Sequence, residues 1–145
     1  MVVKVKKLVP DAVLPKKAHK DDAGYDLVAV SGGWVDEERL YVYHTGLAFE
    51  IPEGYVGLVF PRSSVAKKDL ILSNCVGVID AGYRGEVTAK FGLANRPQLR
   101  GDLIYHAGDR IAQIVFVKLP DVQLVESEEL GESVRGTGGY GSSGE

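Results

Sequence analysis

At Asn74-Cys-Val-Gly-Val-Ile-Asp-Ala-Gly-Tyr-Arg-Gly85, an apolar strand carries an aspartate into a glycine-containing turn, and a new strand begins at Glu86. Branched apolar residues beside such a turn predict a β-hairpin. The hairpin would hold Asp80 rigidly at a strand end. There the carboxylate could act as a general base that orients and deprotonates water, or it could close an Asx turn.

Alternating or β-branched runs, bounded by Gly, Pro, Asn and Asp, recur along the rest of the chain. Short strands at this spacing are typical of an all-β sandwich, barrel or jelly roll. We expect one short helix, at Ser63–Leu70, where Ser63 or Ser64 could cap the N-terminus. The expected strands are Val2–Val9, Tyr25–Val30, Leu40–Tyr43, Leu47–Ile51, Tyr55–Phe60, Gly77–Ile79, Glu86–Leu93, Leu103–His106, Arg110–Lys118 and Val122–Val125.

The overall composition fits one globular domain, because 145 residues are enough to bury a core. The net charge of -3 argues against a general nucleic-acid binder, so an anion site has to be built locally. No apolar run is long enough to span a membrane, and Met1–Lys7 lacks the apolar stretch of a signal peptide. Cys75 is the single cysteine, which excludes an intrachain disulfide and fits a reducing compartment. We therefore expect a cytoplasmic protein without nucleic-acid or membrane partners.

The last eleven residues, Arg135–Glu145, form a glycine-rich tail with one arginine, one tyrosine and three hydroxyl side chains. Backbone amides of such a segment can converge on an anion, the arginine can pair with phosphate, and Tyr140 can stack on a flat ring. The same composition is also typical of a disordered chain end. Gly136–Gly141 matches G-x-G-x-x-G, but no helix can follow it, so a Rossmann site is excluded. The linker Leu119–Val134 could span up to roughly 50 Å and carry the tail to a neighbouring subunit.

Arg62, Ser63 and Ser64 follow a predicted strand and precede the predicted helix. An arginine and two hydroxyls at a helix N-terminus could bind phosphate, or they could form only a capping turn. Ser64 to Lys67 matches S-x-x-K, but the companion motifs of that serine nucleophile are missing. The three histidines are isolated, which argues against a metal cage; they are His19, His44 and His106.

Two shorter segments carry further polar candidates. In Gly108–Gln113, period-two alternation puts Arg110 and Gln113 on opposite faces of a strand. Gln113 could donate to an anion, while Arg110 would pair with an acid. In Ala23–Leu27, Asp26 stands beside a small, flexible step.

Five segments, in this order, resemble the motifs of the trimeric dUTPase family (deoxyuridine triphosphate pyrophosphatases), and the match covers nearly the whole chain. They are Ala23–Leu27, Pro61–Ser64, Gly77–Gly85, Gly108–Gln113 and Arg135–Gly144. The resemblance implies a distorted jelly-roll or β-barrel fold with one short helix, assembled as a homotrimer. Residues 1–134 would form the jelly-roll domain with its linker, and 135–145 a flexible arm that closes over a neighbouring active site.

The same resemblance implies hydrolysis of dUTP to dUMP and pyrophosphate, which limits uracil incorporation into DNA and supplies dUMP for thymidylate synthesis. Asp80 would activate water for in-line attack on the α-phosphorus. Mg²⁺ would ride on the triphosphate oxygens, and Asp26 would touch it through water only. One subunit would supply the first, second and fourth motifs, another the third, and a third its C-terminal arm.

Substrate contacts are implied for residues of four motifs and for Asn74. Phosphate contacts fall on Arg62, Ser63, Ser64 and Gln113, uracil contacts on Asn74, Val78 and Ile79, the deoxyribose contact on Tyr83, and the arm's contacts on Arg135, Tyr140, Gly141, Ser142 and Ser143. Ser64 stands where the family commonly has glycine, and Tyr140 where many members have phenylalanine; the ring is kept at the second position.

Two alternatives share the fold. A dCTP deaminase would require a catalytic glutamate where this sequence has Lys90. A non-catalytic nucleotide-binding regulator would not need Asp80 and Arg135, which are both present.

Overall fold

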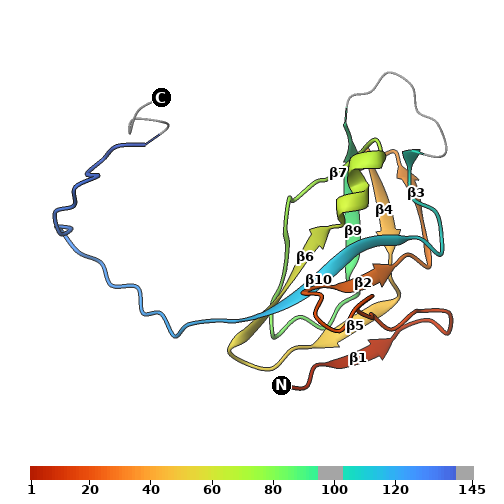
Figure 1. The fold of residues 1–145 in the computed structure, drawn as a ribbon, viewed down its shortest axis with the longest axis horizontal. Coiled ribbons are helices and arrows are strands. Elements are labelled where there is room, and N and C mark those ends of the chain that lie inside the picture. Colours follow the sequence, from red (N-terminus) through yellow and green to blue (C-terminus); the bar gives the residue numbers. More distant parts are fainter. Residues whose placement is uncertain (95–102, 140–145) are drawn as a thin grey trace.

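The computed structural model describes residues 1–94 and 103–139. In this part of the chain it has ten strands and a short 3₁₀ helix, η1 (Ser63–Lys67). Figure 1 shows how these elements are arranged. The strands are β1 (Lys4–Lys7), β2 (Tyr25–Val28), β3 (Ser31–Val35), β4 (Leu40–His44), β5 (Leu47–Glu50), β6 (Tyr55–Pro61), β7 (Leu70–Leu72), β8 (Gly77–Ile79), β9 (Thr88–Leu93) and β10 (Arg110–Lys118).

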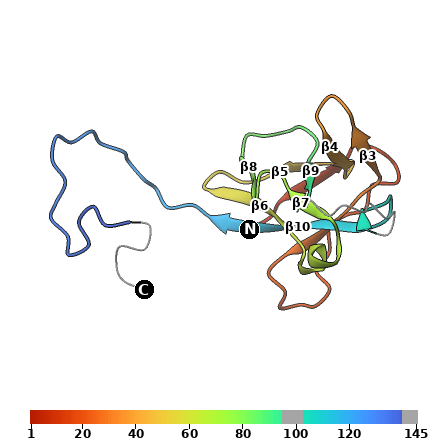
Figure 2. The ribbon, with the colours of Figure 1, turned by 90° about the horizontal axis from the view of Figure 1, so that it is seen from above.

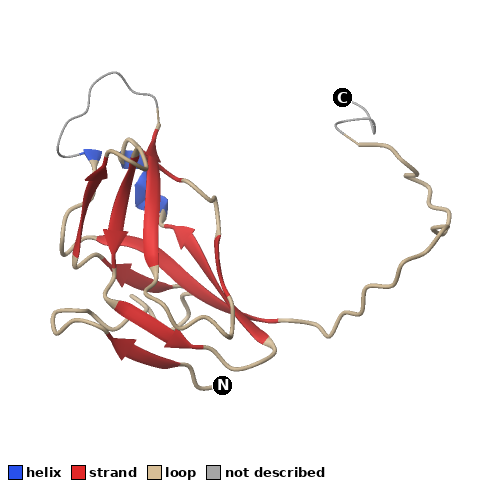
Figure 3. Cartoon of the chain, turned by 180° about the vertical axis from the view of Figure 1, so that it is seen from behind, coloured by secondary structure: helices blue, strands red, loops and turns tan. Residues whose placement is uncertain are grey.

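Two four-stranded antiparallel sheets form the body of the molecule (Figure 3). Their strand orders are β2-β10-β6-β8 and β3-β4-β9-β7, and β1 pairs with β5 in a small third sheet. From β6 to β10 the chain alternates between the two large sheets, so that strands adjacent in space are distant in sequence. The predicted β-hairpin across the Asp80 turn is therefore wrong: β8 pairs with β6, whereas β9 pairs with β4 and β7 in the other sheet. This two-sheet arrangement with crossing connections confirms the expected all-β jelly roll.

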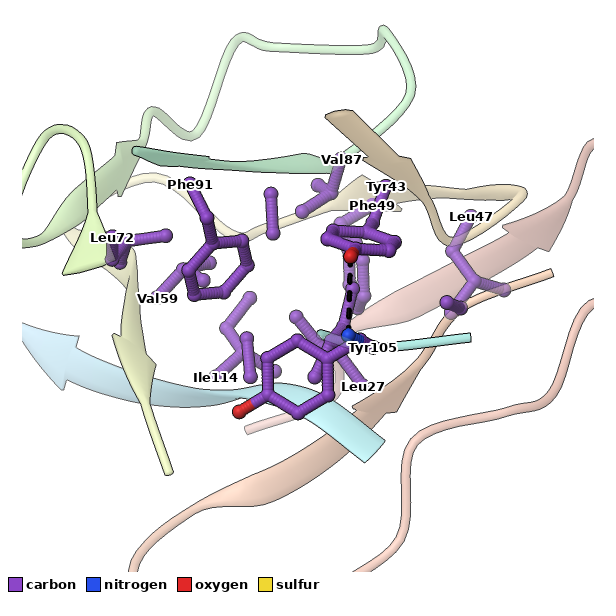
Figure 4. Packing of buried hydrophobic residues seen from close by; sticks show 14 of the residues in the cluster. Leu27, Tyr43, Leu47, Phe49, Val59, Leu72, Val87, Phe91, Tyr105 and Ile114 are labelled. Atoms are coloured by element: carbon purple, nitrogen blue, oxygen red, sulfur yellow. Dashed lines mark hydrogen bonds between the residues drawn. The ribbon is translucent and has the colours of Figure 1, made fainter. Parts of the chain in front are cut away.

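Side chains from both large sheets meet in one buried core (Figure 4). Tyr43 of β4 packs edge-on against Phe91 and Tyr105, with ring centroids 5.8 Å apart in both pairs. The Tyr43 hydroxyl accepts a hydrogen bond from the backbone N–H of Tyr105 at 3.1 Å. Burial raises the pKa of Tyr43 to about 12, so its phenol is neutral at physiological pH.

Two observed strands, β3 and β7, do not follow from the sequence pattern. In β3, Gly32 and Gly33 look like a turn, but the strand pairs with β4 along its whole length. The three-residue β7 begins at Leu70, the last residue of the predicted helix. Leu70 is buried and pairs with Leu93 of β9, so tertiary packing outweighs the local helical pattern.

Two predicted strands, residues 103–106 and 122–125, are wrong. In the first segment the side chain of Tyr105 lies in the core instead, and its backbone N–H donates to the Tyr43 hydroxyl rather than to a neighbouring strand. In the second, Leu124 is 92% exposed and no strand of the described residues lies beside it. An apolar alternating run becomes a strand only where a neighbour takes its backbone hydrogen bonds.

The predicted helix is shorter than expected and is a 3₁₀ helix. η1 ends at Lys67, and Arg62 rather than a serine occupies its N-cap, without a side-chain capping bond. The Ser64 hydroxyl accepts a hydrogen bond from Arg62 Nη1 at 3.1 Å instead. Such a short 3₁₀ turn has almost no dipole, so any phosphate affinity of this segment comes from its side chains and not from a helix N-terminus.

Candidate active site

A polar cavity of about 220 Å³, here called the Asp26 pocket, opens beside one end of the β2-β10-β6 sheet. In this sheet Gln113 of β10 pairs with Asp26 of β2 on one side and with Phe60 of β6 on the other. This register brings residues from three predicted motifs to one place. The pocket is lined by Ala18, Asp22, Ala23, Gly24, Asp26, Arg62, Ser63 and Gln113.

Asp26 is the charged centre of this pocket. Its side chain is 16% exposed, and its two oxygens accept from Arg62 Nε at 2.6 Å and Arg110 Nη1 at 3.0 Å. Arg62 also donates to Ser64, as described above, so the guanidinium is held from two sides. Asp26 therefore positions Arg62, and Ser64 supports Arg62 without lining the pocket itself.

A β-bulge in β10 places both Arg110 and Gln113 beside Asp26. The pairing with β2 shifts between Arg110 and Ala112, and Ile111 and Ala112 are both fully buried. The extra residue changes the alternation, so the expectation that Arg110 and Gln113 lie on opposite faces is wrong. Two adjacent apolar residues at Ile111-Ala112 are the sequence signal for this bulge. The expected pairing of Arg110 with an acid is confirmed.

Gly24 allows Gln113 to approach the backbone of the Asp26 pocket. A Cβ at position 24 would lie 2.4 Å from Gln113 Oε1 and 3.1 Å from Gln113 Cβ. The amide of Gln113 donates one hydrogen bond from Nε2 to the carbonyl oxygen of Pro61 at 3.1 Å. Because an amide nitrogen carries two hydrogens, the second can serve a bound anion.

A second cavity, of about 180 Å³ and here called the Asp80 pocket, lies at the end of β8. Asp80 is exposed there and follows the last residue of the strand. A backbone hydrogen bond from Tyr83 N to Asp80 O, at 3.0 Å, closes the turn, so the turn does not depend on the carboxylate. The pocket is lined by Val78, Ile79, Asp80, Tyr83, Glu86, Val87 and Thr88.

Asn74 lies next to the Asp80 pocket rather than in it. It lines a neighbouring cavity of about 310 Å³ together with Ser73, Thr88 and Lys90. Thr88 borders both cavities, so they adjoin. Lys90 itself is paired with Glu38 at an exposed position.

The two named pockets lie at opposite ends of β6. Ile79 pairs with Gly57, so Asp80 leaves the sheet near the start of β6, opposite Val56, whereas Arg62 follows the end of that strand. Six residues of extended strand correspond to about 20 Å. Asp80 and Arg62 of one chain therefore cannot act on the same small group of atoms.

The described part of the tail lies apart from both pockets. Beyond β10 the chain runs away from the body, as Figure 2 shows. Arg135 is exposed and donates from Nε to the carbonyl oxygen of Gly138 at 2.9 Å. The other predicted tail residues lie outside the described residues; they are Tyr140, Gly141, Ser142 and Ser143.

Sequence reasoning missed one pair at the rim of the Asp80 pocket. Glu86 Oε2 lies 2.9 Å from His44 Nδ1, so His44 is not isolated. The only sequence signal was an acid at the first position of a predicted strand.

Within the ranges that the structure describes, no cluster of three or more histidine, cysteine, aspartate or glutamate side chains could hold a metal ion. None of the helices in those ranges has the length and apolar composition needed to span a bilayer.

Comparison with known proteins gives one consistent family. A dUTPase family model matches residues 11–144. The deoxyuridine 5'-triphosphate nucleotidohydrolase of Rhodococcus erythropolis is 44% identical over 98% of this chain and 85% of its own length. Its counterpart in Corynebacterium glutamicum is 43% identical over 98% of this chain and 94% of its own length.

Solved structures agree with this match. A mutant dUTPase of Staphylococcus bacteriophage 80alpha with dUpNHpp is 32% identical, with a TM-score of 0.85 over 99% of this chain and 98% of that one. A mutant dUTPase from phage phi11 of S. aureus, described with a structural Mg(II) ion, is 29% identical, with a TM-score of 0.74 over 89% of this chain and 98% of that one.

Proposed function

The chain belongs to the dUTPase family and is a dUTP diphosphatase, and from this premise we propose that its active site is completed between the subunits of a homotrimer, with Asp80 as the general base. The observation that carries the proposal is the separation of about 20 Å between Asp80 and Arg62 along β6. Each lies in a pocket built from family motifs. Among the described residues, no arginine or lysine lines the Asp80 pocket. The two carboxylates of the Asp26 pocket already accept hydrogen bonds, Asp26 from two arginines and Asp22 from His19 N.

In the proposed reaction Asp80 takes a proton from a water molecule as the water oxygen attacks the α-phosphorus of dUTP. The new bond is P–O(water), and the bond that breaks joins the α-phosphorus to the oxygen that bridges to the β-phosphorus. Pyrophosphate leaves on the side opposite to the attack, and dUMP remains. The exposed position of Asp80 at a rigid strand end suits this role, because the base must reach water directly.

The phosphate chain would bind in the Asp26 pocket of a second subunit. Arg62 offers a guanidinium, Ser63 a hydroxyl and Gln113 an amide hydrogen, and all three line that pocket. Ser64 would contribute by holding Arg62 rather than by touching phosphate. Because these donors are held before substrate arrives, they can stabilise charge on the departing pyrophosphate without a large rearrangement.

The nucleoside would bind along β8. This strand lies at the edge of its sheet, so Val78 and Ile79 have backbone groups that are not taken by a second neighbouring strand in the described sheet. Such an edge can form hydrogen bonds to the uracil ring, with Asn74 beside it. Tyr83 would support the deoxyribose and exclude a 2′-hydroxyl.

The cofactor is Mg²⁺, and the Asp26 pocket fits the ion in a particular way. Each Asp26 oxygen already accepts one guanidinium hydrogen bond and keeps a lone pair for a water molecule. Asp26 would therefore hold Mg²⁺ through water, as this ion's reluctant loss of water favours. When bound, the ion supplies charge neutralisation on the triphosphate oxygens.

The C-terminal arm would complete the site from a third subunit. Arg135 would bind the outer phosphate and Tyr140 would stack on uracil, with Gly141, Ser142 and Ser143 adding donors. In this arrangement residues 1–134 are the jelly-roll domain with its linker, and 135–145 are the arm. We further propose that the enzyme works in the cytoplasm, where it limits uracil incorporation into DNA and supplies dUMP.

The test is pyrophosphate release by the purified protein with Mg²⁺ and each of dUTP, dTTP, dCTP and UTP. We expect fast release from dUTP and much slower release from the other three; equal turnover of all four would contradict the proposed specificity. Asp80→Asn should bind nucleotide but lose on the order of 10²–10⁴-fold in kcat. A near-normal kcat would show that Asp80 is not the base.

A further inference from the structure

Glu86 is a partly buried carboxylate at the rim of the Asp80 pocket, with 28% of its side chain exposed. Its Oε2 lies 2.9 Å from His44 Nδ1, and its Oε1 accepts a hydrogen bond from Gly46 N at 2.7 Å. His44 ends β4 and Gly46 lies in the corner before β5. The side chain thus joins the end of the Asp80 turn to the β4–β5 corner.

The backbone at Glu86 also holds Tyr83. The Tyr83 hydroxyl donates to the carbonyl oxygen of Glu86 at 3.0 Å. The ring lies against Gly85, where a Cβ would come within 2.4 Å of the hydroxyl oxygen and 2.6 Å of Cζ. Since Tyr83 is 44% exposed, core packing does not fix it. The backbone of residues 85 and 86 does.

The remaining anchors of this segment start one residue later. Val87 N donates to Leu47 O at 2.9 Å, and Val87 O accepts from Thr45 Oγ1 at 2.6 Å. The backbone hydrogen bond of Tyr83 N, by contrast, stays inside the turn. The carbonyl group of Glu86, which receives the Tyr83 hydroxyl, shares one rigid peptide with Val87 N and is therefore held by Leu47 O. The Glu86 carboxylate adds a second anchor on the other side of the residue, next to Gly85, against which the Tyr83 ring lies.

We propose that Glu86 is a positioning residue for sugar selection: by tying the turn to the β4–β5 corner, it fixes the Tyr83 ring where it excludes a ribose 2′-hydroxyl. The inference rests on the proposed role of Tyr83 in the dUTPase site. Without the tie, the turn and its tyrosine gain freedom to move away from the sugar. A ribonucleotide then fits better, while Asp80 chemistry itself is retained.

The experiment compares kcat/KM for dUTP and UTP, with Mg²⁺, in the full-length protein and in Glu86→Ala. We expect the preference for dUTP over UTP to fall by about tenfold or more, because small misplacements of a positioning group have effects of this size. Glu86→Gln keeps an oxygen acceptor for Gly46 N and should stay closer to wild type. Glu50→Ala removes a comparable acid that pairs with Lys4 on the surface, and it should leave the preference unchanged.

The same comparison in a Tyr83→Ala variant separates a positioning role of Glu86 from a merely structural one. Tyr83→Ala removes the wall itself, so adding Glu86→Ala to it should not lower the preference further. The inference would be overturned if Glu86→Ala lowered the preference for dUTP over UTP equally in the wild-type and Tyr83→Ala proteins. It would also be overturned if a folded Glu86→Ala protein kept the wild-type preference. If Glu86→Ala does not fold, Glu86→Asp carries the same test, since its shorter side chain cannot keep both contacts.

The experiment also distinguishes a wrong role for Tyr83 from a wrong role for Glu86. If Tyr83→Ala retains full preference for dUTP, the role of Tyr83 is wrong and the inference falls with it. If Tyr83→Ala loses the preference and Glu86→Ala keeps it, only the role of Glu86 is wrong.

Discussion

Gly24→Ala tests whether the Asp26 pocket depends on the close approach of Gln113. The added Cβ would lie 2.4 Å from Gln113 Oε1, which can swing aside, but also 3.1 Å from both Cβ and Cδ, which are closer to the β10 backbone. Relief of these contacts requires the amide to turn and β10 to shift slightly. The hydrogen bond from Gln113 to Pro61 would then be lost.

The expected size follows from these contacts. Overpacking costs about 1–3 kcal/mol, and the lost hydrogen bond about 1 kcal/mol. Loss of one preorganised donor to the developing charge costs on the order of 10²-fold in kcat. We therefore expect a folded protein with lower resistance to urea and with kcat/KM for dUTP reduced by about 10²-fold.

Pyrophosphate release and urea denaturation, measured on the same preparations, provide the assay. Gly33→Ala is the matched control, because a Cβ there meets no atom within 4 Å. In a Gln113→Ala background, the additional cost of Gly24→Ala should shrink, since two of the three close atoms are gone. A Gly24→Ala enzyme with wild-type kcat/KM would refute the role of Gln113 in this pocket.

Three further outcomes are expected. Asp26→Asn should lower kcat/KM for dUTP by about 10²-fold because Arg62 loses its charged partner, and an unchanged value in steady-state kinetics would remove Asp26 from the site. The phenylalanine of a Tyr43→Phe variant cannot ionise. In the wild type, burial raises the pKa of Tyr43 above its value in the unfolded chain, so the stability that the neutral phenol gives the folded protein is complete below pH 10 and is lost as the pH rises toward about 12. The stability gap between wild type and Tyr43→Phe in urea titrations should thus narrow by up to about 1.4 kcal/mol per pH unit above pH 10, and a constant gap would contradict this. Ending the chain after Val134 should leave a folded protein of unchanged size on gel filtration with kcat/KM about 10²-fold lower, because phosphate and stacking contacts are lost; full activity would show that the arm is dispensable.

The sequence is most informative where local chemistry and tertiary structure agree. The apolar run before Asp80 predicts β8 at its observed bounds, because a short branched run beside a glycine turn has few other stable states. The clustering of Asp26, Arg62 and Gln113 follows from the register of β2, β10 and β6, which no local pattern encodes. The family motifs nevertheless named these three residues.

Where the predictions from sequence are wrong, the structure is determined by contacts with segments that are distant in sequence or by the lack of such contacts. Gly32 and Gly33 become strand because β4 lies beside them, and the run at 122–125 remains irregular because no partner strand does within the described residues. The bulge at Ile111 puts Arg110 and Gln113 on the same face of β10, whereas simple alternation predicts opposite faces. Glu86 was passed over because its partners, His44 and Gly46, are about forty positions away in sequence.

Complementation between two inactive variants tests the proposed shared site most directly. Asp80→Asn and Arg62→Ala chains are each expected to be nearly inactive, and they are refolded together in equal amounts. If Asp80 and Arg62 act from different subunits, about a quarter of the sites in randomly mixed trimers contain both intact residues, so pyrophosphate release from dUTP should recover to about a quarter of the wild-type rate. A rate no higher than the mean of the two separate variants would show that no such shared site exists.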